Sequence, residues 1–284
     1  MHKTGWLLYG SSDAEHNRWF IDKLINECSL LGLELTLVYT DFPSEMPAGD
    51  PDIIINRSRN CTVAYEFEKR GVRLVNPAVV TEIGNDKELS YELAERLGIP
   101  YMPYITVKHP VYEDLRDKAA GFGYPFVLKP SDGHGGKDVC LIRDEGQLET
   151  SFREICSGNG GCPYDKLILQ RCASVMGRDL RIYMMDNRII AGMLRIAGND
   201  SDLRANYSLG GKAMVHPLTE RERLLAERIS DALPSDFIGI DLIYHNGEPV
   251  FNEIEDAVGS RMLYEKTDLD AVRMFGEHIC SLLS

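Results

Sequence analysis

Apolar and polar positions alternate along the first quarter of the chain in a way that predicts strands separated by helices. Short apolar runs typical of strands occupy residues 5–10, 33–39, 52–56 and 72–75. Between the first two runs, apolar side chains recur every three or four positions from Trp19 to Cys28, which is the spacing of one helix face. Strands that alternate with helices form βαβ units, so we expect a small parallel sheet here.

The rest of the chain has a different pattern, in which neighbouring strands are joined by short turns. Helical spacing predicts helices over residues 86–97, 112–121, 145–156, 219–233 and 269–282. Apolar runs predict strands over residues 104–107, 126–129, 139–142, 167–170, 179–185, 188–194, 237–244 and 249–254. Turns at 186–187 and 245–248 make the last four strands two hairpins, which indicates an antiparallel sheet. The polar, glycine-rich segment 197–212 predicts a long mobile loop.

Composition and charge narrow the choice of function. The 284 residues carry 44 acidic and 31 basic side chains, a net charge of −13, which disfavours nucleic acid or an anionic membrane as the partner. No apolar run reaches the roughly 18 residues of a membrane helix, and the first ten residues do not resemble a signal peptide. Seven cysteines without a Cys-x-x-Cys motif argue against a disulfide framework or a zinc ribbon, so we expect a cytoplasmic protein.

A lysine followed by a glycine-rich turn is the first chemical signal. Lys129 ends one predicted strand, and the turn from Gly133 to Gly136 separates it from the next. Glycines allow backbone N–H groups to approach an anion, and a lysine adds a point charge for phosphate. The segment lacks the Gly-Lys-Ser/Thr sequence of a Walker loop. A flexible hairpin loop without a ligand is equally consistent with this pattern.

Three carboxylates near the C-terminus form the second signal. Asp241 lies on one predicted strand, while Glu253 and Glu255 lie two positions apart on its hairpin partner, so all three can share one face. Carboxylates on neighbouring strands repel one another unless a cation lies among them. All-oxygen ligands suit magnesium that bridges nucleotide phosphates. The alternative is a solvated strand face.

Basic residues before and between these two segments form the third signal. They are Lys87, Arg178, Arg181, Arg195, Arg204 and Lys212. In an acidic chain, basic groups on the polar loop beside Asn206 suggest a clamp for an anionic ligand. Taken singly, each of these residues is more often part of a surface ion pair.

These three signals, in this order, resemble the ATP-grasp superfamily over nearly the whole chain. The resemblance is greatest to the RimK-like carboxylate–amine ligases, which include ribosomal-protein glutamate ligases and lysine-biosynthesis ligases. The matching segments are residues 71–80, 85–87, 97–100, 126–130, 133–136, 167–173, 177–181, 195 and 202–211. Among them, Gly177-Arg178-Asp179-Leu180-Arg181 resembles the family's Gly-x-Asp-x-Arg motif.

The resemblance implies an α/β and α+β protein with the ATP-grasp fold. An N-terminal parallel α/β domain is expected over residues 1–84. A central α+β subdomain with the phosphate loop would cover residues 85–175, and a C-terminal α+β subdomain with the metal ligands would cover residues 176–284. The two subdomains would clamp ATP between them.

The resemblance also implies roles for single residues. ATP would contact Lys87, Lys129, Gly133, Gly135, Gly136, Gln170, Arg171, Cys172, Ala173 and Asp179. Asp241, Glu253 and Glu255 would bind Mg²⁺, with two ions expected and Mn²⁺ able to substitute. The charge that develops during the reaction would be stabilised by Arg195, Arg204 and Asn206. The substrates would contact Arg57 and Arg261. The turn after the first strand, with Ser11, Ser12, Asp13 and Asn17, is another place where small ligands often bind.

Two positions depart from the family pattern. Glu255 stands where the family usually has Asn, and the Ser-Pro-Gly that usually follows is replaced by Asp256-Ala257-Val258. A glutamate still offers oxygens to a metal but adds a negative charge, so the family's usual substrate need not carry over. Gln170 replaces an acidic residue at the adenine hinge, a small change if backbone groups read the base.

The implied activity is ligation of a carboxylate to an amine. ATP would phosphorylate the carboxylate, and the amine would displace phosphate to give an amide, ADP and phosphate. The partners would be a small-molecule or peptide carboxylate and an amine, with a homo-oligomer left open. The alternatives are an ATP-grasp kinase, a thioester-forming ligase and a non-catalytic ATP-binding regulator. The presence of every expected phosphate lysine and metal carboxylate favours an enzyme.

Overall fold

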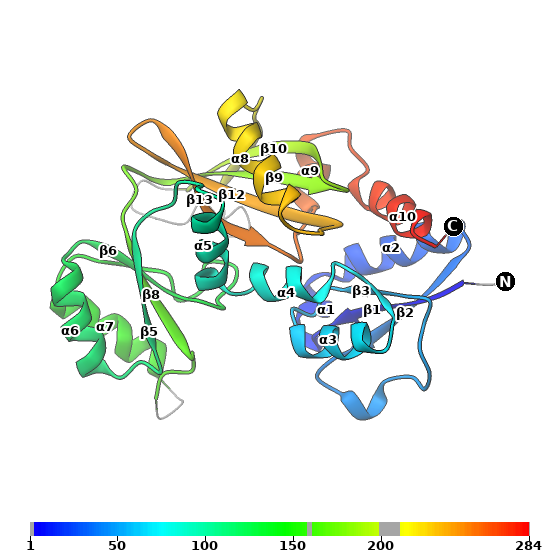
Figure 1. Ribbon diagram of the computed structural model, residues 1–284, viewed down its shortest axis with the longest axis horizontal. Coiled ribbons are helices and arrows are strands. Elements are labelled where there is room, and N and C mark those ends of the chain that lie inside the picture. Colours follow the sequence, from blue (N-terminus) through cyan, green and yellow to red (C-terminus); the bar gives the residue numbers. More distant parts are fainter. Residues whose placement is uncertain (1–2, 158–160, 199–210, 284) are drawn as a thin grey trace.

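The first sheet forms one end of the molecule and is entirely parallel (Figure 1). A computed structural model describes residues 3–157, 161–198 and 211–283. The strands run in the order β2-β1-β3-β4, namely β1 (Lys3–Tyr9), β2 (Leu33–Tyr39), β3 (Ile53–Asn56) and β4 (Arg73–Val75). The helices of this region are α1 (Ser11–His16), α2 (Arg18–Leu30) and α3 (Cys61–Lys69), with a short 3-10 turn, η1 (Pro43–Glu45). The predicted parallel sheet is confirmed.

Both faces of this sheet are covered, which explains why β1 is apolar without interruption from Gly5 to Tyr9. Leu7 and Tyr9 pack into one hydrophobic cluster with α2, whereas Trp6 and Leu8 pack into another with Phe67 of α3. Successive side chains of a strand point to opposite faces, so a strand buried on both sides shows no polar alternation.

The second sheet, at the opposite end, is antiparallel with the order β5-β8-β6-β7 (Figure 1). Its strands are β5 (Tyr104–Lys108), β6 (Phe126–Pro130), β7 (Cys140–Ile142) and β8 (Lys166–Arg171). The helices α6 (Tyr112–Phe122) and α7 (Glu145–Cys156) bury Leu115 and Leu148 against it. The glycine-rich turn connects β6 to β7 and therefore leaves the sheet at a strand end.

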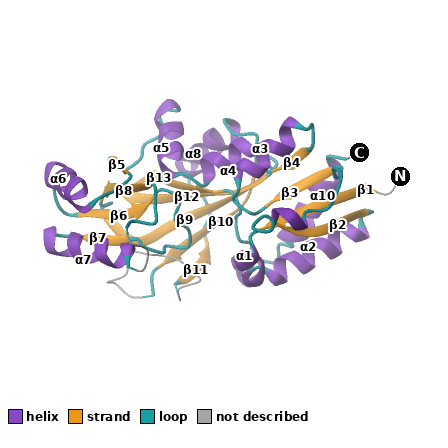
Figure 2. Ribbon diagram, turned by 90° about the horizontal axis from the view of Figure 1, so that it is seen from below, coloured by secondary structure: helices purple, strands orange, loops and turns teal. Residues whose placement is uncertain are grey.

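The third sheet lies between the other two and has five antiparallel strands in the order β11-β10-β9-β12-β13 (Figures 1 and 2). The strands are β9 (Val175–Met185), β10 (Arg188–Ile196), β11 (Lys212–Val215), β12 (Phe237–His245) and β13 (Glu248–Glu255). Both predicted hairpins are present, and positive φ angles at Asp186 (50°), Asn187 (56°), Asn246 (51°) and Gly247 (83°) shape their turns. Helix α8 (Glu220–Asp231) packs on this sheet and begins with a capping box between Thr219 and Glu222.

Several elements pack against sheets from another part of the chain. Helix α5 (Lys87–Arg96) buries Tyr91 in the core of the third sheet. Helix α10 (Ala271–Ser281) packs on α2, so the C-terminus closes one face of the first sheet. The division of the chain at 84/85 and 175/176 stays a prediction.

Several short elements were not predicted, among them η1, α4 (Ala78–Gly84), α9 (Arg261–Lys266) and β11. Each spans seven residues or fewer, too few to show a periodicity. Most of the predicted loop 197–212, including Arg204 and Asn206, lies outside the described residues, and Lys212 begins β11. In the part of the chain that the structure describes, no helix combines the length and apolarity needed to cross a membrane.

Candidate functional site

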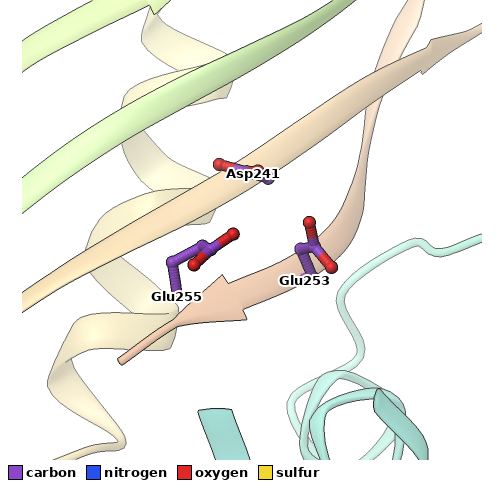
Figure 3. A group of neighbouring side chains, drawn as sticks. All are labelled: Asp241, Glu253 and Glu255. Atoms are coloured by element: carbon purple, nitrogen blue, oxygen red, sulfur yellow. The ribbon is translucent and has the colours of Figure 1, made fainter. Parts of the chain in front are cut away.

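The three predicted carboxylates converge on one face of the β12–β13 hairpin (Figure 3). Asp241 pairs with Glu253 across the two strands, and Glu255 pairs with Gly239 two positions away. One oxygen from each carboxylate lies within 4.8 Å of the others. Asp241 is fully buried, while Glu253 and Glu255 are partly exposed. Three convergent carboxylates are an all-oxygen donor set, and they fit a hard cation such as Mg²⁺.

A β-bulge in β13 adds a fourth polar side chain to this site. Leu242 pairs with Phe251 and Asp241 pairs with Glu253, so Asn252 is the extra residue. Its Oδ1 accepts a hydrogen bond from Lys129 Nζ (3.4 Å). In a regular strand the side chain of Asn252 would point to the face away from Glu253, and for this reason the sequence pattern did not identify Asn252 as part of the site.

Two arginines compensate the buried charge of Asp241. Arg181 donates to both Asp241 oxygens (2.7 Å each) and to Glu255 (2.9 Å). Arg195 donates to Asp241 (2.5 Å) and to both oxygens of Asp179 (2.5 and 2.9 Å). Burial alone would raise the pKa of Asp241, but the two guanidinium groups hold it below its ordinary value. The Arg195 guanidinium is therefore hydrogen-bonded to the carboxylates of Asp179 and Asp241, and its role at a reacting phosphate stays a prediction.

The two predicted phosphate lysines face the same site from different elements. Lys87 is the first residue of α5, which Asp86 caps, and its Nζ donates to Gly133 O (2.6 Å) and lies 3.5 Å from Glu253. Lys129 is 5% exposed, and its Nζ donates to the Tyr91 hydroxyl (2.9 Å). Burial lowers the pKa of Lys129 to about 8. Sequence analysis missed Tyr91, whose helical position resembles that of any core aromatic.

The glycine-rich turn closes over these lysines. Gly135 and Gly136 have φ angles of 65° and 72°, which disfavour residues with a Cβ atom. His134 precedes these glycines and lines the same pocket as Lys87, and burial together with the charges of Arg59 and Lys87 lowers its pKa to about 4. The imidazole is therefore neutral near pH 7.

A cavity that we call the main pocket joins these groups. Its charged lining residues are Lys87, Lys129, Arg171, Arg178, Arg195, Asp179, Glu253 and Glu255. Five cationic and three anionic side chains leave a local excess of positive charge in a chain of net charge −13. Apolar side chains of Val127, Met176 and Ile243 line the same pocket. The pocket thus combines an apolar wall with a cationic end, as a nucleotide requires.

The predicted adenine hinge borders this pocket. Gln170, Arg171 and Ala173 line it, whereas Cys172 does not. The Gln170 side chain points inward and donates to the Tyr91 hydroxyl (2.9 Å), and Arg171 donates to the carbonyl oxygens of Phe122 and Gly123. These side chains are therefore engaged within the protein, as is the Arg171 backbone N–H, which donates to Pro103 O (2.8 Å).

The two predicted substrate arginines lie in different surroundings. Arg57 is buried, donates to the Tyr9 hydroxyl (2.8 Å) and to the carbonyl oxygens of Ala257 (3.1 Å) and Val258 (2.9 Å), and stacks over Phe20. These bonds join segments 200 residues apart, which is a structural role. Arg261 is exposed at the start of α9.

Two further cavities adjoin the main pocket. The middle pocket lies among Tyr9, Asp13, Arg57, Arg59, His134 and Glu255. The outer pocket lies among His16, Trp19, Arg181, Ser260, Arg261 and Met262. Of the four residues named after the first strand, Asp13 and Asn17 line the middle pocket, whereas Ser11 and Ser12 line none of these three cavities.

Comparison with known proteins identifies the family. Residues 84–277 match the RimK-like ATP-grasp domain. The chain is 33% identical over 258 residues to human N-acetylaspartylglutamate synthase A, covering 89% of this chain and 64% of that protein. It is 31% identical over 249 residues to beta-citrylglutamate synthase B of Danio rerio, covering 87% and 60%. The chain thus spans less than two thirds of the length of these two relatives.

Solved structures show the same fold. D-cycloserine synthetase DcsG matches with a TM-score of 0.74 at 19% identity, covering 99% of this chain and 100% of that one. A RimK domain ATP-grasp protein from Sphaerobacter thermophilus matches with a TM-score of 0.70 at 19% identity, covering 98% of both. The predicted ATP-grasp fold is confirmed, and the chain belongs to the RimK-like ATP-grasp family.

Proposed function

We propose that this protein is an ATP-dependent carboxylate–amine ligase that releases ADP and phosphate. The observation that carries the proposal is the convergence of Asp241, Glu253 and Glu255, because the two glutamates of this group line the cationic pocket together with Lys87 and Lys129. The relatives named as synthases support ligation over a hydroxyl kinase or a non-catalytic regulator.

Each part of the pocket has a proposed task in binding ATP. Asp241, Glu253 and Glu255 would hold Mg²⁺, two ions in the fully loaded site, which supplies charge neutralisation at the phosphates. Lys87 and Lys129 would bind phosphate oxygens beside the glycine-rich turn. Backbone groups of residues 170–173 would read adenine, and Asp179 would lie near the ribose.

The reaction needs no nucleophile from the protein. A carboxylate oxygen of the donor attacks the γ-phosphorus and ADP leaves, which forms an acyl phosphate. The amine then attacks the acyl carbon, phosphate leaves with the bonding electrons, and the amine loses a proton as the amide forms. Arg195, Arg204 and Asn206 are proposed to stabilise the developing charge. Water must be excluded because it would hydrolyse the acyl phosphate.

The acceptor is proposed to bind in the outer pocket. Arg261 lines this pocket, is exposed and makes no ion pair with the residues that the structure describes, so its guanidinium can receive a carboxylate in a forked contact. An amino acid or peptide amine with its own carboxylate fits this arrangement.

None of the seven cysteines forms a disulfide in the described structure, in keeping with a proposed cytoplasmic location.

The test is a product assay with acids suggested by the relatives' names. The protein is incubated with ATP, Mg²⁺, L-glutamate and either N-acetyl-L-aspartate or citrate, followed by mass spectrometry and measurement of phosphate. We expect an amide product with one ADP and one phosphate per bond. A product that keeps the phosphoryl group would identify a kinase, and no ADP with any acid and amine of a wider panel would refute the ligase.

A further inference from the structure

Three neighbouring cavities in the described part of the molecule share walls, and the main and outer pockets have only Arg195 in common. The main pocket and the middle pocket share His134, Gly135 and Glu255. The middle pocket and the outer pocket share Asn17, Arg181 and Gly259. A molecule in the middle pocket therefore lies between the glycine-rich turn and the site proposed for the acceptor. It also lies against Glu255, one of the carboxylates beside which the terminal phosphate of ATP would bind.

The arginines around the middle pocket differ in how many of their donor groups are already used. Arg57 bonds to Tyr9 and to two carbonyl oxygens, and Arg181 bonds to two carboxylates. Arg59 makes a single side-chain hydrogen bond among the described residues, from Nη1 to Asp13 Oδ2 (2.5 Å). Its Nε and Nη2 groups thus remain available, and its side chain is 25% exposed. A guanidinium with one edge free is suited to a forked contact with a carboxylate.

The turn that carries Arg59 is held in an uncommon conformation. Arg59 has a φ of 58°, in the left-handed region that residues with a Cβ atom rarely adopt. Asn56 Oδ1 accepts hydrogen bonds from the Ser58 backbone (3.2 Å) and hydroxyl (2.7 Å), and the Asn60 side chain caps α3. These bonds fix both sides of Arg59, so the turn presents the guanidinium at the carboxyl ends of β1 and β3. Ligands of parallel sheets bind at such ends.

Arg59 also faces the glycine-rich turn. Its charge is one of the causes, after burial, of the lowered pKa of His134, so the guanidinium lies within electrostatic reach of the residue that separates the two pockets. The Asp13 carboxylate, on the first turn of α1, accepts a hydrogen bond from Arg59 and lines the same pocket. The alternative is that Arg59 and Asp13 form an ordinary surface ion pair without a function. The pair differs from one in that both residues line a cavity that Glu255 also lines.

We propose that the middle pocket binds the acyl donor and that Arg59, positioned by Asp13, anchors a carboxylate of that donor. This inference rests on the proposed ligase function and names the donor's binding site within it. The donor would lie beside Glu255, with the acceptor amine approaching from the outer pocket. The role predicted for Arg57 belongs, in this proposal, to the arginine two positions later.

The test compares Arg59→Met, Arg59→Lys and Asp13→Asn with a matched control. Arg70→Met removes another arginine of the same sheet region, which pairs with Asp50 and stacks on Phe67 away from the pockets. Calorimetry measures binding of N-acetyl-L-aspartate and of citrate to protein loaded with ADP and Mg²⁺. We expect Arg59→Met to weaken acid binding at least tenfold and ADP binding less than twofold. Arg59→Lys should be intermediate because it keeps the charge and loses the fork.

Steady-state kinetics with whichever acid is a donor gives a second readout. Arg59→Met should raise the KM for that acid at least tenfold and leave the KM for ATP within twofold, and Asp13→Asn should have a smaller effect in the same direction. The proposal is overturned if Arg59→Met binds the acids like the wild type, if ADP affinity falls in parallel, or if the wild type binds neither acid. Acid binding that depends on Arg59 without any ligation would instead count against the proposed function.

Discussion

Lys129 shows how burial gives a common residue an uncommon property. Its ammonium group lies among Tyr91, Asn252 and apolar side chains, and Glu253 offsets only part of the desolvation, so its pKa falls to about 8. The protonated form is the one that binds a phosphate oxygen. A nucleotide would therefore select the protonated lysine and raise its pKa.

The sign of the resulting pH dependence follows from this equilibrium. Below pH 8 the lysine is protonated before ADP binds, and above pH 8 a proton must be taken up together with ADP. We expect the affinity for ADP and Mg²⁺ to fall above pH 8, by up to about tenfold per pH unit. Calorimetry between pH 6.5 and 9.5 measures this. Lys129→Met should bind more weakly at pH 7 and show no such fall; a parallel decline in this variant would assign the effect to another group.

Glu253 is the carboxylate best suited to a test of metal binding. It is partly exposed and its nearest cation, Lys87, is 3.5 Å away, so Glu253→Gln should leave the melting temperature nearly unchanged. We expect turnover of ATP with Mg²⁺ to fall about 100-fold or more. Glu248→Gln, an exposed position on the same strand paired with Arg221, serves as the control. Equal turnover in the two variants would remove the metal assignment.

At the level of single residues, sequence analysis found most of the charged groups but not their environments. The carboxylates and lysines stand out because charged residues rarely interrupt buried strands. The distinction between Arg57 and Arg59 was not predictable from the sequence. It arises because carbonyl oxygens 200 residues away accept hydrogen bonds from Arg57, whereas Arg59 bonds only to Asp13 among the described residues.

At the level of elements, one asparagine side chain joins the ends of three strands. Asn76, just after β4, accepts hydrogen bonds from the backbone of Asp236 (2.7 Å) and Phe237 (2.9 Å) at the start of β12. Its amide group donates to Phe237 O (3.0 Å) and to Asp256 Oδ1 (2.7 Å) at the end of β13. The hairpin that carries the candidate metal ligands is thus fixed to the parallel sheet.

Removing this side chain should be costly. Asn76→Ala leaves two backbone N–H groups without this partner and removes one hydrogen bond from the buried Asp256 carboxylate, so we expect the free energy of unfolding to fall by about 3 kcal/mol. Urea denaturation followed by circular dichroism measures the change. Asn85→Ala, which removes a longer hydrogen bond to the same Asp256 (3.3 Å), should cost less than half as much. Similar losses in both variants would show that Asn76 has no special part in joining the strands.

The elements themselves were largely predictable where they are long. Apolar alternation and the turn residues Asp186-Asn187 identify the hairpins because these signals are local. The bulge at Asn252 was not predictable, because it arises from the pairing of β13 with β12, and the five antiparallel strands acquire their order only through that pairing.

At the scale of the whole molecule, the first and third sheets share a hydrophobic core. Phe275 of α10 lies in the same cluster as Leu24 of α2, and its ring centroid is 5.1 Å from that of Phe237 on β12. The N-terminal sheet therefore buries one face with residues from the end of the chain. We expect the two sheets to unfold together.

The substitution Phe275→Ala tests this coupling. It should lower the free energy of unfolding by about 3 to 5 kcal/mol. Both tryptophans, Trp6 and Trp19, lie in the N-terminal region, so their fluorescence reports on the first sheet while circular dichroism reports on the whole chain. The two signals should shift together, and Leu30→Ala at a position 75% exposed should change little. An unshifted fluorescence transition would show that the sheets unfold independently.

The sequence by itself determined which strands form the parallel sheet and which form antiparallel hairpins. It also determined the glycine-rich turn and the carboxylates of the candidate metal site. These features depend on residues close together in the chain, where side-chain alternation and turn preferences act directly. The tertiary structure decided which arginines keep free donors, why Lys129 loses its proton readily and how the three pockets adjoin. Those properties come from burial and from contacts between distant segments, whose partners no local pattern specifies.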